Sequence, residues 1–208
     1  MRGDESTLPE SLEESILRAG FVEGHEALLV ASLHESSPRL RVLALRGAAR
    51  RALMTQVEWL AALADDDATV RREAAHLLAY DELGDELITS ALRKTLQDSD
   101  PLVVESTVFA LGEHGSIDAL EQLCAVAIEH EDARCREAAV AALGSLGDDR
   151  GRSTILQALN DKPPVRRRAI VALANFEGPD IDAALERARD DRDWQVRSAV
   201  DQLTRDED

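Results

Sequence analysis

The chain has 208 residues, of which 44% are hydrophobic and only 3% are aromatic, so Ala, Leu and Val must supply most of its core. Its 41 acidic and 24 basic residues give a formal net charge of −17, which disfavours nucleic acid as a partner. Apolar stretches end well before the roughly 20 residues that a membrane helix needs, and the acidic start MRGDESTLPE lacks the features of a secretory signal. We therefore expect a cytoplasmic protein without membrane contact.

A short helix is predicted first, from Pro9 to Ala19, inside an N-terminal segment that covers residues 1–23. The rest of the chain repeats itself. Six segments align in register: LRVLALRGAA from Leu40, VRREAAHLLA from Val70, VVESTVFALG from Val103, CREAAVAALG from Cys135, VRRRAIVALA from Val165 and VRSAVDQLTR from Val196. Their starts lie 30, 33, 32, 30 and 31 residues apart, so the period is close to 31 residues.

Each of these segments predicts a helix, because its apolar positions 1, 5, 8 and 9 fall on one helical face. A second amphipathic helix is predicted in each repeat, at about residues 24–36, 56–65, 85–98, 116–130, 150–160 and 180–190. Neither helix buries its apolar face alone, but stacked hairpins do. We therefore predict an all-α fold, an α-solenoid of about six helical hairpins that forms a single domain over residues 24–208. The aligned helices should line its concave side. The repeats are expected at residues 24–54, 55–84, 85–115, 116–147, 148–177 and 178–208.

Aspartate and arginine recur at fixed places in the repeat. Asp stands three residues before position 1, where it suits a helix N-cap, in four copies: Asp67, Asp100, Asp132 and Asp193. Arg stands at position 2 in five copies: Arg41, Arg71, Arg136, Arg166 and Arg197. The third copy has Val104 there. We expect a structural ladder in which each Arg pairs with a cap Asp of its own or an adjacent repeat. The alternative is a basic ridge that binds an acidic partner.

The pattern Asp-x-x-Val-Arg-x-x-Ala-x-x-Ala-Leu-Gly resembles HEAT-like repeats, in particular the short class named after phycobilisome lyases. The resemblance covers about residues 24–208 and is carried best by DATVRREAAHLLA, DPLVVESTVFALG, DARCREAAVAALG and KPPVRRRAIVALA. It implies a structural role for the Asp and Arg pair. It does not select one function, because such repeats serve in scaffolds, adaptors, lyases and a family of metal hydroxylases.

The resemblance also indicates what an enzyme of this kind would need. The HEAT-like hydroxylases hold two irons with His-Glu dipeptides at positions 3 and 4 of the repeat, which supply nitrogen and carboxylate ligands. Here those positions hold Val42-Leu43, Arg72-Glu73, Glu105-Ser106, Glu137-Ala138, Arg167-Arg168 and Ser198-Ala199. None has His, and only Glu73 keeps the acid. The His-Glu pairs of the chain lie elsewhere: His25-Glu26, His34-Glu35 and His130-Glu131. We predict no metal, no cofactor and no catalytic residue; the alternative is an enzyme or enzyme subunit of the bilin-lyase or di-iron hydroxylase kind.

Positions 3 and 7 of the aligned helices point away from the core. Residues at these positions are predicted to line a groove on the concave side. The predicted partner-binding residues are Arg72, His76, Glu105, Phe109, Ala141, Arg167 and Val171. Outward apolar side chains with charged neighbours are typical of a partner surface, unless adjacent repeats cover them. We predict a non-catalytic adaptor or scaffold that binds another protein there through an acidic or amphipathic segment. Trp194 is expected to cap the end of the stack, or else to anchor the partner.

Composition bears on the source of the protein. Lys occurs only at positions 94 and 162, so 22 of the 24 basic residues are Arg. An acidic surface with almost no Lys is expected of a halophilic archaeon, and an acidic protein from a GC-rich bacterial genome is the alternative. Cys124 and Cys135 stand among apolar residues, so we expect inert core thiols in a reducing compartment.

Overall fold

The computed structural model describes residues 11–81 and 86–205, and every regular element within these ranges is helical. The predicted all-α fold class, built from successive helical hairpins, is confirmed. The chain forms two compact units, residues 1–77 and 78–208. Three parts of the chain lie outside the described residues: residues 1–10 of the predicted N-terminal segment 1–23, the repeat boundary at residues 84 and 85, and residues 206–208. The single domain over residues 24–208 stays a prediction.

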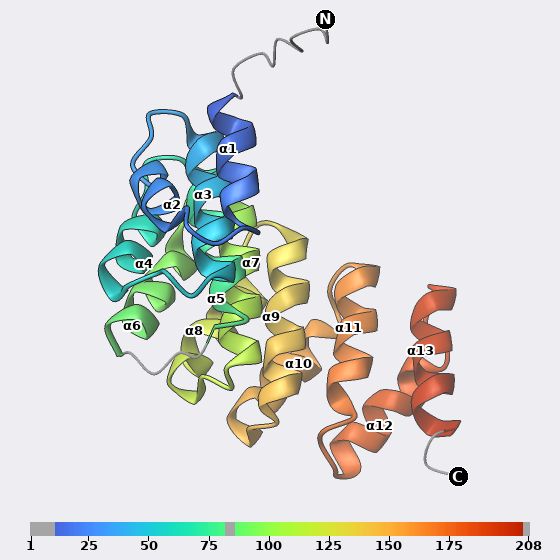
Figure 1. Ribbon diagram of the computed structural model, residues 1–208. Coiled ribbons are helices and arrows are strands. Elements are labelled where there is room, and N and C mark those ends of the chain that lie inside the picture. The colour runs from blue at the N-terminus through green and yellow to red at the C-terminus, as the bar shows by residue number, and fades with distance from the viewer. Residues whose placement is uncertain (1–10, 82–85, 206–208) are drawn as a thin grey trace, which may run out of the picture. The chain divides into compact units, whose positions relative to one another are not determined.

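The first unit is built around helix α3. Its helices are α1 (Leu12–Ala19), α2 (Glu26–Ser32), α3 (Pro38–Arg50), α4 (Gln56–Leu63) and α5 (Ala68–Leu78), the last of which reaches the boundary of the unit. Helices α1 and α2 both pack on α3 (Figure 1), where Ile16, Leu29 and Ala44 belong to one fully buried cluster. The predicted N-terminal helix is therefore present, and a capping box stabilises its start.

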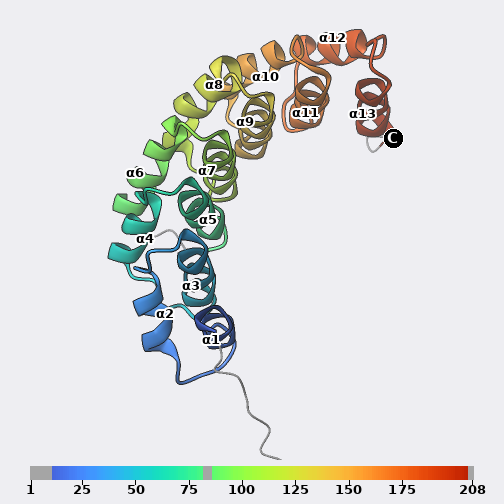
Figure 2. The same ribbon diagram turned by 90° about the horizontal axis from the view of Figure 1, so that it is seen from above.

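The second unit has two layers of helices. One layer holds α7 (Pro101–Glu113), α9 (Ala133–Leu146), α11 (Pro163–Leu173) and α13 (Trp194–Arg205), each packed against the next. The other holds α6 (Glu86–Lys94), α8 (Leu120–Glu129), α10 (Arg152–Ala158) and α12 (Pro179–Ala188). Within this unit, Figure 2 shows α7, α9, α11 and α13 on the inner, concave side, as predicted. We call the outward surface of these four helices the inner face.

Aspartate residues begin most of the inner helices. Asp100 and Asp132 are the N-caps of α7 and α9, and each side chain accepts the backbone N–H two residues further along. Asp193 accepts the same kind of bond at the start of α13. Helix α11 instead has Pro163 in its first turn, where a missing N–H costs nothing. The predicted Asp caps are confirmed, and they fix the starts of α7, α9 and α13.

Small residues allow the first three inner helices to approach closely. Gly112 of α7 faces Ala142 of α9, and Gly144 of α9 faces Ala172 of α11. A Cβ added at Gly144 would lie 2.6 Å from the Cβ of Ala172, closer than two carbon atoms can pack. The glycine is always at position 10 of one repeat and the alanine at position 8 of the next.

The contact between α11 and α13 departs from this rule. Position 10 of α11 is Ala174, and position 8 of α13 is the much larger Leu203. Leu203 packs against a cluster that contains Ile170, Val196 and Val200, and α13 touches α11 less extensively than α11 touches α9. The last inner helix is therefore packed by a bulky side chain at a place where the others are packed backbone to backbone.

We expect Gly144→Ala to destabilise the protein by about 1–3 kcal/mol, because overpacking of a close helix contact outweighs the better helix propensity of alanine. Urea unfolding followed by circular dichroism measures the change. Ser145→Ala on the same helix is the control, since Ser145 is exposed and should change stability little. A Gly144→Ala variant as stable as the wild type would contradict the close-packing argument.

Candidate functional site

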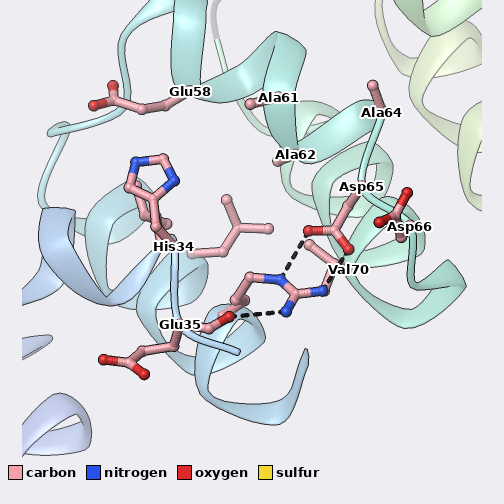
Figure 3. A pocket seen from close by; sticks show the side chains of 12 residues that line it. His34, Glu35, Glu58, Ala61, Ala62, Ala64, Asp65, Asp66 and Val70 are labelled. Atoms are coloured by element: carbon pink, nitrogen blue, oxygen red, sulfur yellow. Dashed lines mark hydrogen bonds and ion pairs between the residues drawn. The ribbon is translucent and has the colours of Figure 1, made fainter. Parts of the chain in front are cut away.

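Position-2 arginines connect the loops of consecutive repeats. In the first unit, Nε and Nη2 of Arg41 donate to the carboxylate of Asp65 at 2.8 and 2.6 Å, and Nη1 donates to the backbone carbonyls of Glu35 and Ser36 at 2.9 and 3.1 Å. Figure 3 shows this pair beside a pocket of about 360 Å³ that His34 and Glu58 also line. Arg41 therefore binds its own loop and the loop of the next repeat together.

The second unit repeats this arrangement twice. Arg136 binds both carboxylate oxygens of Asp161 at 2.6 and 2.7 Å, and Arg166 binds those of Asp191 at 2.9 and 2.7 Å. The four side chains are largely buried. Hydrogen bonds from the arginines hold the pKa of Asp161 and of Asp191 below its ordinary value, and the same bonds raise the pKa of Arg136 and of Arg166.

The aspartates of these pairs differ from the predicted ones. The predicted partners were the cap residues Asp67, Asp100, Asp132 and Asp193, whose side chains instead accept backbone N–H groups at the helix starts. The arginines use Asp65, Asp161 and Asp191, one or two residues before the cap position, where the side chain faces the preceding repeat. Arg71 and Arg197 each donate to carbonyls of their own loops, at 2.8 Å to Asp65 and 2.7 Å to Asp191.

At one step of the ladder, both the arginine and its loop aspartate are replaced by other residues. Val104 of α7 takes the place of the arginine and is fully buried. His130 takes the place of the loop aspartate, and its Nδ1 accepts the backbone N–H of Asp132 at 3.1 Å, as the carboxylates of Asp65 and Asp191 do two residues before their caps. The side chain of Asp132 pairs with Arg134. The substitutions at 104 and 130 thus remove a charge of each sign together.

The inner face of the second unit holds five of the seven predicted partner-binding residues: Glu105, Phe109, Ala141, Arg167 and Val171. Phe109 is 38% exposed and Val171 is 51% exposed, so adjacent repeats leave both side chains partly accessible. Ala141 lies half-buried on α9, between the helices that carry these two residues. The other two predicted residues belong to α5 in the first unit, where Arg72 is half-buried and His76 is exposed.

Sequence reasoning missed an aromatic neighbour of Phe109. Tyr80, in the turn after α5, is 70% exposed, and its ring centroid lies 6.1 Å from that of Phe109 with the planes tilted by 56°. This spacing is typical of favourable aromatic pairs. Nothing in the period identifies Tyr80, because it falls in a turn outside the aligned positions.

At the other end of the inner face, α11 and α13 enclose a depression of about 350 Å³. Arg167, Arg168, Val171 and Trp194 line it, together with polar residues of α13. Nη1 of Arg167 approaches Oε1 of Gln195 at 3.4 Å. Trp194 is 65% exposed, so it does not serve as a buried end cap. The signal in the sequence was a tryptophan directly after a cap aspartate, where other copies have Ala or Pro.

Glu73 and Cys135 both have structural partners. Glu73, the one acid kept in the hydroxylase slots, is buried and binds Arg46 through two bonds of 2.7 Å. The Cys135 thiol is buried and donates to the carbonyl of Pro101 at 3.1 Å, and burial raises its pKa to about 11. Both cysteines are free thiols. A thiol with a raised pKa is a poor nucleophile.

No helix in the described ranges has the length and apolar character needed to cross a membrane.

Comparisons with known proteins agree on the architecture. A family model for HEAT repeats matches residues 57–143 and 120–204. The chain is similar to the X-ray structure of YibA from Escherichia coli, with 17% identity, a TM-score of 0.65 and coverage of 95% of this chain and 75% of that one. It is also similar to a designed armadillo repeat protein in complex with the peptide (KR)4, with 14% identity, a TM-score of 0.59 and coverage of 94% and 99%.

A third similar structure is the complex of CpcE and CpcF of phycocyanin lyase from Nostoc sp., with 21% identity, a TM-score of 0.51 and coverage of 97% of both chains. No curated protein matches the sequence. At these identities the solved structures show the fold alone.

The lowered pKa of Asp161 and Asp191 predicts acid sensitivity. A carboxyl whose pKa is lower in the folded chain stabilises the fold above its unfolded pKa, here 3.8, and this contribution is lost as the pH falls. We expect the wild type to lose stability below about pH 4–5. The Asp161→Asn/Asp191→Asn variant should be less stable at pH 7 and show a flatter profile in acid. Thermal unfolding between pH 7 and pH 3 measures both, with exposed Asp190→Asn as the control. If the stability of the wild type and that of the double variant depended equally on pH, a role for these pairs would be refuted.

The replaced step of the ladder predicts a compensating pair of mutations. Val104→Arg alone should cost about 3–5 kcal/mol, because it buries an unpaired charge. Adding His130→Asp should recover about 1–3 kcal/mol of that loss by restoring the ion pair. Urea unfolding of both single variants and the double variant gives the coupling energy. Additive effects would show that residue 130 does not occupy the ladder position.

Proposed function

Because the chain belongs to the HEAT repeat family, we propose that it is a non-catalytic adaptor that binds a segment of a partner protein on the inner face of its second unit. The observation that carries the proposal is the row of exposed apolar side chains on that face, Phe109, Val171 and Trp194, with exposed Tyr80 beside Phe109. Repeat solenoids use such extended inner surfaces for binding. Aromatic anchors on a rigid support supply most of the affinity in protein interfaces.

The framework suits this role because ion pairs between loops and close helix contacts fix the inner helices in place. The Arg136–Asp161 and Arg166–Asp191 pairs fix the loops that precede α9 and α11, and the Gly144–Ala172 contact fixes the distance between these helices. A partner would therefore meet a surface whose geometry is already formed, which reduces the entropy lost on binding.

Two of the similar structures support partner binding in general terms. The designed armadillo repeat protein was solved with a bound peptide, and CpcE was solved in complex with CpcF. The free cysteines and the acidic, lysine-poor composition support a reducing cytoplasm, and a salt-rich one would favour apolar contacts because exposed charge pairs are screened.

The proposal that the protein is not an enzyme rests on its own residues. Five of the six hydroxylase slots lack an acid at position 4, and the single acid in the remaining slot, Glu73, is bound by Arg46. The His-Glu dipeptides lie at helix ends outside the inner face: His25-Glu26 starts α2, His34-Glu35 follows α2 and His130-Glu131 follows α8.

We expect Phe109→Ala combined with Arg167→Glu to weaken partner binding about tenfold or more, because both side chains lie on the proposed contact surface. The test is a crosslinked, tagged pull-down from the native host at its cytoplasmic salt concentration, quantified by mass spectrometry. Ile128→Ala is the matched control, since Ile128 is an exposed apolar residue of α8 in the outer layer.

The double variant must keep the helical circular dichroism spectrum of the wild type. A partner retained equally by the double variant and by the Ile128→Ala control would refute the inner face as the binding surface. Purified protein that carries stoichiometric iron or a tetrapyrrole would instead support the alternative function as a hydroxylase or bilin lyase.

A further inference from the structure

The depression between α11 and α13 differs in charge from the rest of the protein. The whole chain carries a formal net charge of −17. Among the described residues that line this depression, Arg167 and Arg168 are charged and none is acidic. The remaining lining combines apolar side chains, chiefly Val171 and Trp194, with side-chain amides. A small basic and apolar site on an acidic protein favours an acidic ligand with an apolar part.

The packing of the inner helices changes at the pair that carries the depression. Gly144 and Ala172 hold α9 and α11 in backbone contact. At the equivalent positions of the next pair, Ala174 and Leu203 replace them, and Ala174 is exposed. Leu203 packs against the buried cluster that contains Val196. The depression therefore coincides with the pair of inner helices that departs from the Gly–Ala contact.

The two arginines have hydrogen-bonding capacity for a ligand. Both approach one carboxylate, that of Glu137, at 4.0 Å from Arg167 and 3.5 Å from Arg168. The ladder arginines, by contrast, bind their own carboxylates at 2.6 to 2.9 Å. Two guanidinium groups that share one distant carboxylate leave a positive charge uncompensated, and both side chains are 41% exposed. A second carboxylate would bind there with charge-assisted hydrogen bonds.

We propose that this depression recognises a two-part element of a partner protein: an aliphatic or aromatic side chain that packs on Trp194 and Val171, next to an Asp or Glu bound by Arg167 and Arg168. This inference rests on the proposed function and names the chemistry of its partner. The indole face of Trp194 supplies a large apolar surface at low entropic cost, and the arginines give the direction of the bound chain.

The spacing of the inner helices sets the form of the partner. Neighbouring packed helices lie about 8–10 Å apart, and an extended chain advances about 3.3 Å per residue. From Phe109 on α7 to the depression is about two and a half helix spacings, or roughly seven residues of extended chain. The partner segment therefore carries a second apolar residue about seven positions from the acidic element, placed to contact the Tyr80–Phe109 pair.

The test uses a phage-displayed library of random twelve-residue peptides, selected against the immobilised full chain. We expect enrichment of peptides with an apolar residue beside Asp or Glu. Affinities of the synthetic peptides are then measured by fluorescence polarisation. Trp194→Ala and the Arg167→Gln/Arg168→Gln variant should each weaken binding about tenfold, whereas Ile128→Ala should not. A peptide with its acid replaced by Gln or Asn should bind the wild type and the double arginine variant equally.

Two other results would overturn the inference in distinguishable ways. Selected peptides that lose affinity with Phe109→Ala, but keep it with Trp194→Ala and with the double arginine variant, would refute this depression and leave the inner face as the binding surface. Peptides unaffected by every inner-face variant, or a library without enrichment, would refute both this inference and the proposed function. Circular dichroism of each variant verifies that the helices are intact.

Discussion

The position-2 arginines Arg41, Arg136 and Arg166 each link their repeat to the next, and the alignment of these inner helices depends on them. Arg136 uses one edge of its guanidinium for both oxygens of Asp161 and donates Nη1 to the carbonyls of His130 and Glu131. A planar bidentate pair fixes direction as well as distance. Because both loops run directly into inner helices, this single side chain fixes the start of α9 relative to the start of α11. The carbonyls that it binds would otherwise need water or strain to be satisfied.

The step without an ion pair shows that the ladder can be exchanged for packing. Around Val104, the third repeat has a fully buried apolar position, a buried hydrogen bond of 2.7 Å between Thr95 and Thr107, and the close contact of Gly112 with Ala142. A well-packed apolar group is often as stabilising as a buried ion pair of similar volume. This step lacks the directional link between loops that an ion pair provides. The alignment of α7 with α9 therefore depends on backbone contact.

The sequence predicted the features that follow from periodicity, and it failed where a single side chain departs from the period. Apolar positions 1, 5, 8 and 9 predicted the helices and their inner layer, and the recurring Asp predicted the caps. The partners of the arginines were misassigned, because Asp65 and Asp67 are both acidic and only the path of the loop decides which one faces the preceding repeat. Trp194 was expected mainly as an end cap, because exposure at the last repeat depends on how far α13 lies from α11, and the pattern does not encode that distance.

The irregular end of the second unit connects its packing to its chemistry. Two successive inner contacts place Gly against Ala. The third has Leu203 at the equivalent position, and a depression lies at the inner face between α11 and α13. Arg167 and Arg168, which share the single carboxylate of Glu137, and the exposed ring of Trp194 meet at that depression. Departures from local regularity are expected at functional sites, and this one, with its partly compensated charge and exposed aromatic surface, is where we propose that the partner binds.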